Sequence, residues 1–333
     1  MAKEKEQNCC EKFKTMIGGQ ALIEGIMMRG PELDAVVIRG EDGLNVETTR
    51  RKLPPKKSVL NWPFVRGIRN FFDAQVTGVK AIMRSADLSP EETQEEPSKL
   101  DLWLENKLGD KRFQNLIVGF AVFMGLGLSI LLFFLLPMII SSLFDEWIKN
   151  TFVLHLMEGV VRIAIFVAYI LLVSRMPDMK RVFAYHGAEH KTIRCYEAGL
   201  DLTVDNVRVQ TRMHPRCGTS FLLVVMILSI LIFSVASTGL LAAVPALEAL
   251  RGSFLYRLIM IVFKLLLLPL VVSVSYELNR LIGRYDNVLT RILTAPGMWF
   301  QNFTTNEPDD EMIEVGIAAL QAVLPDQEGL DRW

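Results

Sequence analysis

The segment Tyr185-His186-Gly187-Ala188-Glu189-His190-Lys191 carries residue types whose spacing could bind a metal ion. Residues four apart on an α-helix lie one turn above each other, so His186 and His190 can hold the same ion. In the His-x-x-Glu-His pattern of inverzincins the two histidines bind zinc, and the glutamate polarises a water molecule. The spacing therefore predicts a divalent metal site, with zinc the default by ligand type and Glu189 as the catalytic base.

A second group of ligand types follows in the same hydrophilic stretch, within His214-Pro215-Arg216-Cys217-Gly218-Thr219-Ser220. A catalytic zinc site usually has three protein ligands and an open position, so either His214 or Cys217 would complete the set. Weaker candidates for the third ligand are Cys195, Glu197 and Glu277. Iron or manganese stays open if carboxylates contribute. In the competing interpretation, the histidines and glutamate hydrogen-bond locally or bind acidic lipid headgroups, and Cys217 is simply buried.

Three arginines of this stretch could clamp an oxyanion or an anionic headgroup: Arg194, Arg212 and Arg216. The start of the helix after Cys217 offers free amides for an anion, although capping by Thr219 and Ser220 is the simpler role. In the hydrolytic mechanism that these residues suggest, the metal lowers the pKa of a bound water and Glu189 accepts its proton. The water then attacks a carbonyl or phosphoryl centre at the membrane face.

The composition is too apolar for an ordinary soluble protein, since hydrophobic residues make up 51% of the 333 residues. Four apolar runs are long enough to cross a hydrocarbon core about 30 Å thick. They cover residues 116–143, 152–174, 221–244 and 255–275. His155, Glu158 and Arg162 interrupt the first half of the second run, which could instead be partly interfacial.

Basic residues predict the orientation in the membrane. Lys and Arg are concentrated before the first run, in the loop 175–220 and after the fourth run, whereas the two other loops are nearly neutral or acidic. The N-terminus also lacks the apolar core and cleavage site of a secretory signal. The positive-inside rule therefore predicts a multi-pass protein of the bacterial cytoplasmic membrane, with both termini and the His-rich loop in the cytosol.

Three charged residues fall inside or near the apolar runs: Glu158, Arg162 and Lys264. Glu158 and Arg162 are four apart and can pair along one helix. In the predicted topology Lys264 could reach the same depth and share Glu158. Such a group could form a polar lock between helices or line a wet cavity.

The expected fold is an α-helical integral membrane protein with about four transmembrane helices and a small cytosolic α+β module at the N-terminus. We divide it into a flexible terminus (1–16), a strand-rich module with an amphipathic helix (17–86), an acidic linker and pre-membrane segment (87–114), a four-helix membrane domain (115–277) and cytosolic C-terminal helices (278–333).

Asp42-Gly43 predicts a hairpin turn. In the loop 175–220 we expect a helix from Met179 to Glu197, stopped by Gly199, and short strands at 202–204 and 207–211. Pro296 is expected to end the helix that follows the fourth run.

Three sequence blocks together resemble the YqhQ-like bacterial membrane proteins. They are Gly18-Gly19-Gln20-Ala21-Leu22-Ile23-Glu24-Gly25-Ile26-Met27-Met28-Arg29-Gly30-Pro31 and the two His-containing segments above. The similarity covers the chain from about Ile17 to Leu324. This family is labelled a domain of unknown function or a predicted metal-dependent enzyme. The resemblance therefore implies functional roles only for His186, Glu189, His190, His214 and Cys217.

Three functions compete on this evidence. The first is a membrane-embedded metallohydrolase with a peptide or lipid-linked substrate. The second is a non-enzymatic scaffold or assembly factor, whose cytosolic regions bind a membrane-protein partner. The third, a transporter or metal-handling protein using Glu158, Arg162 and Lys264, is weaker because the spans lack clear inverted repeats or a run of intramembrane ligands. The expected environment is the lipid bilayer, and no specific nucleic-acid partner is evident.

Overall fold

The computed structural model describes residues 12–55, 57–88, 110–144, 147–148, 150–285, 287–327 and 329–332. Residues 1–11 and most of the expected acidic linker, 89–109, lie outside the described residues. The chain forms two compact units, which are treated separately below. The first comprises Met1–Pro90, Ile170–Val225 and Val272–Trp333, and the second Glu91–Tyr169 and Met226–Val271. The finer domain division expected from the sequence stays a prediction.

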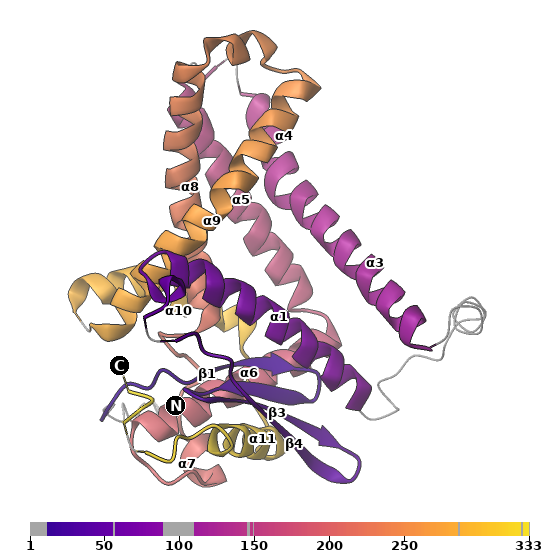
Figure 1. The fold of residues 1–333 in the computed structure, drawn as a ribbon, viewed down its shortest axis with the longest axis vertical. Coiled ribbons are helices and arrows are strands. Elements are labelled where there is room, and N and C mark those ends of the chain that lie inside the picture. Colours follow the sequence, from indigo (N-terminus) through magenta and orange to yellow (C-terminus); the bar gives the residue numbers. More distant parts are fainter. Residues whose placement is uncertain are drawn as a thin grey trace, which may run out of the picture. The chain divides into compact units, whose positions relative to one another are not determined.

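An antiparallel sheet of four strands lies at the centre of the first unit (Figure 1). The strands, in spatial and sequence order, are β1 (Gly18–Leu22), β2 (Gly25–Arg29), β3 (Leu33–Gly40) and β4 (Gly43–Arg50). Gly43 closes the β3–β4 hairpin at a φ of 116°, which confirms the turn expected at this glycine. Because successive side chains of a strand point to opposite faces, both faces of this sheet can be covered.

Two helices cover one face of the sheet and a third covers the other. Helix α6 (Pro177–Glu197) and α11 (Asp310–Gln321) pack on the face that carries Ile26, Met28, Ala35 and Val37. On the opposite face Ala81 of α1 (Val65–Leu88) packs against Leu22 and Met27. These three layers fix α6, the helix with the His-x-x-Glu-His motif, against strand β1.

Two local predictions for the first unit were wrong. Residues 204–208 form helix α7 (Val204–Arg208) instead of strand, because the Thr203 side chain accepts a hydrogen bond from Asn206 N and caps a helix. Pro296 does not end a helix but lies inside α10 (Val288–Thr304). The break lies earlier, where Asn287 and Thr290 form a reciprocal capping box that starts a new helix. A 3-10 turn, η1 (Val59–Asn61), precedes α1.

The second unit is built from helices and holds most of the four apolar runs. Its elements are α3 (Asp110–Ile130), the π-helical η3 (Leu131–Leu135), α4 (Leu136–Ser142) and the 3-10 turn η4 (Pro245–Leu250), together with parts of α5 (Thr151–Val173), α8 (Gly218–Ala243) and α9 (Phe254–Arg284). Four helical segments are long and apolar enough to cross a membrane: Gly119–Ser142, Thr151–Val173, Phe221–Ala243 and Phe254–Arg284. The second apolar run is thus one continuous helix of sufficient length.

Glu158 is the shared acceptor of a buried charge cluster in the second unit. Lys264 Nζ lies 2.6 Å from both carboxylate oxygens of Glu158, and the Lys264 side chain is 1% exposed. Arg162 donates to Glu158 Oε1 over 2.8 Å and to the carbonyl oxygen of Phe133 over 2.7 Å. Phe133 belongs to the π-helical η3, where the regular helical hydrogen-bond pattern is shifted. The structure therefore brings together all three charged residues that the sequence placed in the spans.

Candidate metal centre

Three side chains of types that could bind a metal ion converge between α6 and the start of α8. They are His186, His190 and Cys217, whose ligand atoms all lie within 4.8 Å of one another. His186 Nε2 is 3.1 Å from Cys217 Sγ, and the two imidazole rings are 4.3 Å apart, centroid to centroid. The spacing of four residues on a single helix places the rings on one face, and the third ligand comes from the loop before α8.

Backbone carbonyls orient both histidines. His186 Nδ1 lies 2.8 Å from the oxygen of Thr304, and His190 Nδ1 lies 2.6 Å from the oxygen of Arg212. A carbonyl oxygen can only accept a hydrogen bond, so each Nδ1 carries a hydrogen, and in its neutral form each ring has its lone pair on Nε2. Partners of this kind fix the tautomer and the direction of metal-ligating histidines in general.

Glu189 is held at one oxygen only. Its Oε1 accepts a 2.9 Å hydrogen bond from the backbone N–H of Gly19 in β1. Its Oε2 is buried and has no hydrogen-bond partner among the described residues. Burial raises the pKa of Glu189 above its ordinary value, although His190 and His186 act in the opposite direction. A carboxylate with a raised pKa is a stronger base than an ordinary one, and its free oxygen can accept and release a proton.

The thiol of Cys217 and the imidazole of His186 shift each other's pKa. Burial alone would raise the pKa of Cys217, but His190 and His186 outweigh it and hold this pKa well below the ordinary value. Burial likewise lowers the pKa of His186, but the negative charge of Cys217 outweighs it and raises this pKa to about 9. The thiolate is the form of cysteine that binds metals.

The residues fit a divalent metal of the zinc type. Two imidazoles and a thiolate form a ligand set used by catalytic zinc sites, which keep a fourth position open. His190 Nε2 is buried without an oxygen or nitrogen partner among the described residues, as is Glu189 Oε2. Buried polar atoms without partners are rare, and an absent ion is one of their ordinary explanations.

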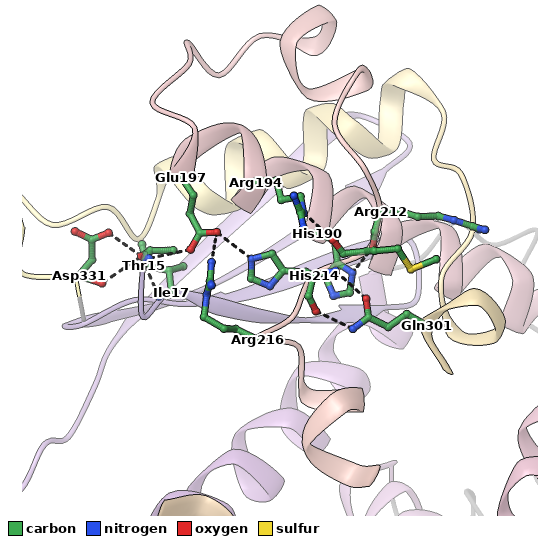
Figure 2. A network of polar contacts seen from close by, with 11 residues as sticks. Thr15, Ile17, His190, Arg194, Glu197, Arg212, His214, Arg216, Gln301 and Asp331 are labelled. Atoms are coloured by element: carbon green, nitrogen blue, oxygen red, sulfur yellow. Dashed lines mark hydrogen bonds and ion pairs between the residues drawn. The ribbon is translucent and has the colours of Figure 1, made fainter. Parts of the chain in front are cut away.

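His214 lies outside this group of three and belongs to a neighbouring polar network (Figure 2). Its Nε2 is 3.1 Å from Glu197 Oε2, which also accepts from Arg216. Gln301 binds the backbone of His214 twice, accepting from its N–H over 2.8 Å and donating to its carbonyl over 2.7 Å. These contacts fix the loop that leads to Cys217.

The predicted anion-binding arginines are mostly used inside the protein. Arg194 donates to the carbonyl of Met213 over 2.7 Å, and Arg212 to that of Thr305, also over 2.7 Å. Arg216 pairs with Glu197 and also lines a cavity of about 610 Å³, which Glu189 and Cys217 border as well. The weaker ligand candidates lie apart: Cys195 contacts the carbonyl of Asp201, and Glu277 pairs with Arg66.

Sequence reasoning missed several residues that position the motif. Glu24, in the turn between β1 and β2, accepts from Arg181 and from the Tyr185 hydroxyl, so this turn is anchored on α6. Gly187 allows the chain after α10 to approach α6, since a Cβ at this position would lie 2.0 Å from the oxygen of Asn306. The only sequence signal for these roles was a glutamate beside glycines and a glycine inside a helix.

Comparisons with known proteins give a family without an activity. A family model described as "Protein of unknown function (DUF1385)" matches residues 62–326. "Uncharacterized protein YqhQ" of Bacillus subtilis (strain 168) is 31% identical over 321 residues, which cover 94% of this chain and 93% of the relative. No solved structure matches the chain. Neither description names a substrate, a metal or a reaction.

Proposed function

This chain belongs to the DUF1385 family of unknown function, which includes YqhQ-like proteins, and we propose that it is a membrane-embedded metal-dependent hydrolase. The observation that carries the proposal is the convergence of His186, His190 and Cys217 beside the buried carboxylate of Glu189. The four helices that are long and apolar enough to span a membrane support the membrane-embedded part of the proposal. The substrate class expected there is a peptide or a lipid-linked compound, reached from the cytosolic face.

Each side chain has a definite task in this proposal. His186, His190 and Cys217 would hold the ion, and the carbonyls of Thr304 and Arg212 orient the two imidazoles through Nδ1. A bound zinc ion would supply Lewis-acid chemistry, lowering the pKa of water and polarising the scissile bond. Glu189 takes one proton from the attacking water and returns it to the leaving group, so that water is added across the cleaved bond.

The hydrogen bond from Gly19 suits Glu189 to this task. It fixes Oε1 and leaves Oε2 free for the proton. An alanine at Gly19 would place its Cβ 2.6 Å from the Met27 oxygen and 3.0 Å from Glu189 Cδ. The glycine therefore supports the site through close contact, as well as through its N–H group.

The first test is elemental analysis of detergent-purified protein beside a His186→Ala/His190→Ala variant. We expect about one transition metal ion per chain in the wild type and loss of that metal in the variant, because two of three ligands are removed. Glu189→Gln should keep the metal and lower turnover by about 10²- to 10⁴-fold, the usual contribution of a general base.

Two results would contradict the proposal. The first is negligible metal in the folded wild type after attempted reconstitution with zinc, iron and manganese. The second is full hydrolytic activity of Glu189→Gln against a substrate that the wild type cleaves. The exposed Glu311 offers a matched control, and Glu311→Gln should leave both metal content and turnover unchanged.

A further inference from the structure

The cavity beside Glu189 and Cys217 is strongly basic. It measures about 610 Å³, within the range typical of small-molecule sites. Its lining contains only two carboxylic acids, Asp73 and Glu189. Against these stand six arginines: Arg29, Arg51, Arg66, Arg69, Arg216 and Arg280. Only Arg216 comes from the stretch in which the sequence suggested anion-binding residues.

Four of these arginines already hold carboxylates. Arg29 pairs with Asp34 and Asp73, Arg51 with Asp34, Arg66 with Glu277, and Arg216 with Glu197. Their guanidinium groups are thereby fixed at the cavity wall. Burial, together with the positive charge of Arg29, lowers the pKa of Arg51, as expected where cations are crowded.

Arg69 and Arg280 differ from the other four. Arg69 donates only to the neutral side chains of Asn61 and Asn70 among the described residues. Arg280, near the end of α9, makes no hydrogen bond or ion pair within the described parts of the chain. Both are half-buried, so their charges are only partly screened by water. These two cations are available to a ligand.

We propose that this cavity binds a phosphate or pyrophosphate group, held by Arg69 and Arg280, on a ligand that extends to Glu189 and Cys217. Guanidinium groups match phosphate oxygens in two parallel hydrogen bonds. Two guanidiniums that pair with no carboxylate among the described residues fit a group with at least two negative charges better than a single carboxylate. Gly218, the first residue of the 26-residue helix α8, also lines the cavity and adds the positive end of a helix dipole.

The assignment of this group to a substrate rests on the proposed hydrolase function, because Glu189 and Cys217 border the same cavity. The phosphate could belong to a lipid headgroup or to a soluble compound, since the arginines recognise the same oxygens in both. Binding by arginine needs no metal, so it can be measured independently of the metal centre.

The test measures binding of inorganic pyrophosphate by calorimetry to the full-length protein in detergent, with EDTA present throughout. The Arg69→Gln/Arg280→Gln variant should bind at least about 10-fold more weakly than the wild type, because charge-assisted hydrogen bonds are lost. Arg69→Lys/Arg280→Lys should recover only part of the affinity, since lysine lacks the guanidinium fork. Arg208→Gln serves as a matched control, because Arg208 pairs with Asp310 and does not line the cavity.

A second arm distinguishes the sources of phosphate. In nanodiscs of phosphatidylcholine with phosphatidic acid, a lipid headgroup ligand should compete and weaken pyrophosphate binding relative to pure phosphatidylcholine. A soluble ligand predicts equal affinity in both. Equal binding by the wild type and the Arg69→Gln/Arg280→Gln variant would overturn the proposal, as would binding of succinate in preference to pyrophosphate. Negligible metal in the wild type, measured by elemental analysis without EDTA, together with intact pyrophosphate binding would instead count against the hydrolase alone.

Discussion

Cys217 and His214 lie three residues apart, yet only Cys217 joins the two histidines of α6. His214 is turned towards Glu197, and Gln301 holds its backbone at both polar groups. The His214 ring lies 5.7 Å from that of His190, centroid to centroid, so the difference between the two candidates is one of direction. Because α6 and α10 both hold the loop, its conformation favours Cys217 over His214 as the third ligand of the proposed site.

The choice between these ligands gives a direct prediction. Cys217→Ser should lose most of the bound metal, because a hydroxyl is a much poorer ligand for zinc than a thiolate. The His214→Gln variant should keep the metal at wild-type stoichiometry, although the thermal stability of the protein should fall. Cys195→Ser is the matched control for removal of a buried thiol. If instead His214→Gln loses the metal and Cys217→Ser keeps it, the third ligand is His214.

Glu197 makes the stability of the site region sensitive to acid. Burial alone would raise its pKa, but His214 and Arg216 outweigh it and lower this pKa from 4.5 to about 2. A depressed pKa stabilises the fold above the pKa of the unfolded chain. This stabilisation, on the order of 3 kcal/mol, is lost as the pH falls from about 5 to about 2. Thermal unfolding in detergent between pH 7 and pH 3 should therefore show a steeper decline for the wild type than for Glu197→Gln. Equal slopes for the two proteins would refute this role of Glu197.

At the scale of elements, local sequence signals predicted those parts whose pattern is complete within a short stretch. The hairpin at Gly43 and the helix that Gly199 terminates at a φ of 63° are of this kind. Val204 to Val209 instead carries β-branched residues, and the capping side chain of Thr203 overrides this weak preference. Pro296 is accommodated within α10, where the helix had already started from the strong capping box at Asn287.

The site likewise has parts that a short stretch of sequence encodes and parts that depend on distant residues. The pairing of His186 with His190 follows from helical periodicity and could be predicted. The contact between Gly19 and Glu189 joins residues 170 positions apart, and that between His186 and Thr304 joins residues 118 apart. No local pattern encodes such a contact, because it depends on how α6 packs against β1 and on where α10 ends. The arginine lining was missed for the same reason, since four of its six members come from β2, α1 and the segment after β4.

A substitution at Gly187 would test whether the packing of α6 against the chain after α10 supports the proposed metal site. Gly187→Ala would place a Cβ 2.0 Å from the Asn306 oxygen, which must move away and take the neighbouring Thr304 carbonyl with it. His186 then loses its orienting partner, and we expect metal affinity to fall about 10- to 100-fold without any change of ligand. Gly239→Ala, in a helix with nothing within 4 Å of the new Cβ, should have no such effect. Unchanged metal affinity in Gly187→Ala would show that this packing does not position His186.

At the scale of the whole molecule, charge buried among helices that could span a membrane must be compensated. One carboxylate, Glu158, faces two cations, Lys264 and Arg162, and the guanidinium of Arg162 also lies 5.4 Å from the ring centroids of Phe134 and Phe233. Within this cluster Glu158 joins α5 to α9, while Arg162 joins α5 to η3. The arrangement has the contacts expected of a lock between helices.

The lock predicts a non-additive mutational response. Glu158→Gln should destabilise the protein by about 3–5 kcal/mol, because two buried cations lose their carboxylate. The double variant Glu158→Gln/Lys264→Met should recover a large part of this loss, since one of those cations is removed. Denaturation in mixed detergent micelles would measure both. If the losses in the free energy of unfolding of Glu158→Gln and Lys264→Met simply add up to that of the double variant, the Glu158–Lys264 pair makes no net contribution to stability.

The distribution of basic residues along the chain predicts the side of the membrane on which the candidate site lies. Arg175, Lys180, Arg181 and Lys191 belong to the stretch between the second and third candidate spans, whereas the stretch between the third and fourth has Glu248 and Arg251 as its only charged residues. Lys and Arg near the ends of spans are retained in the cytosol.

A fluorescent protein fused after residue 333 or inserted at residue 200 should therefore fluoresce, and alkaline phosphatase fused after residue 251 should be active. Exchange of the two reporters at each position provides the control, because each is functional on only one side. Active phosphatase at residue 200 would place the metal centre outside the cytosol, and the substrate would then have to be sought among extracytoplasmic compounds.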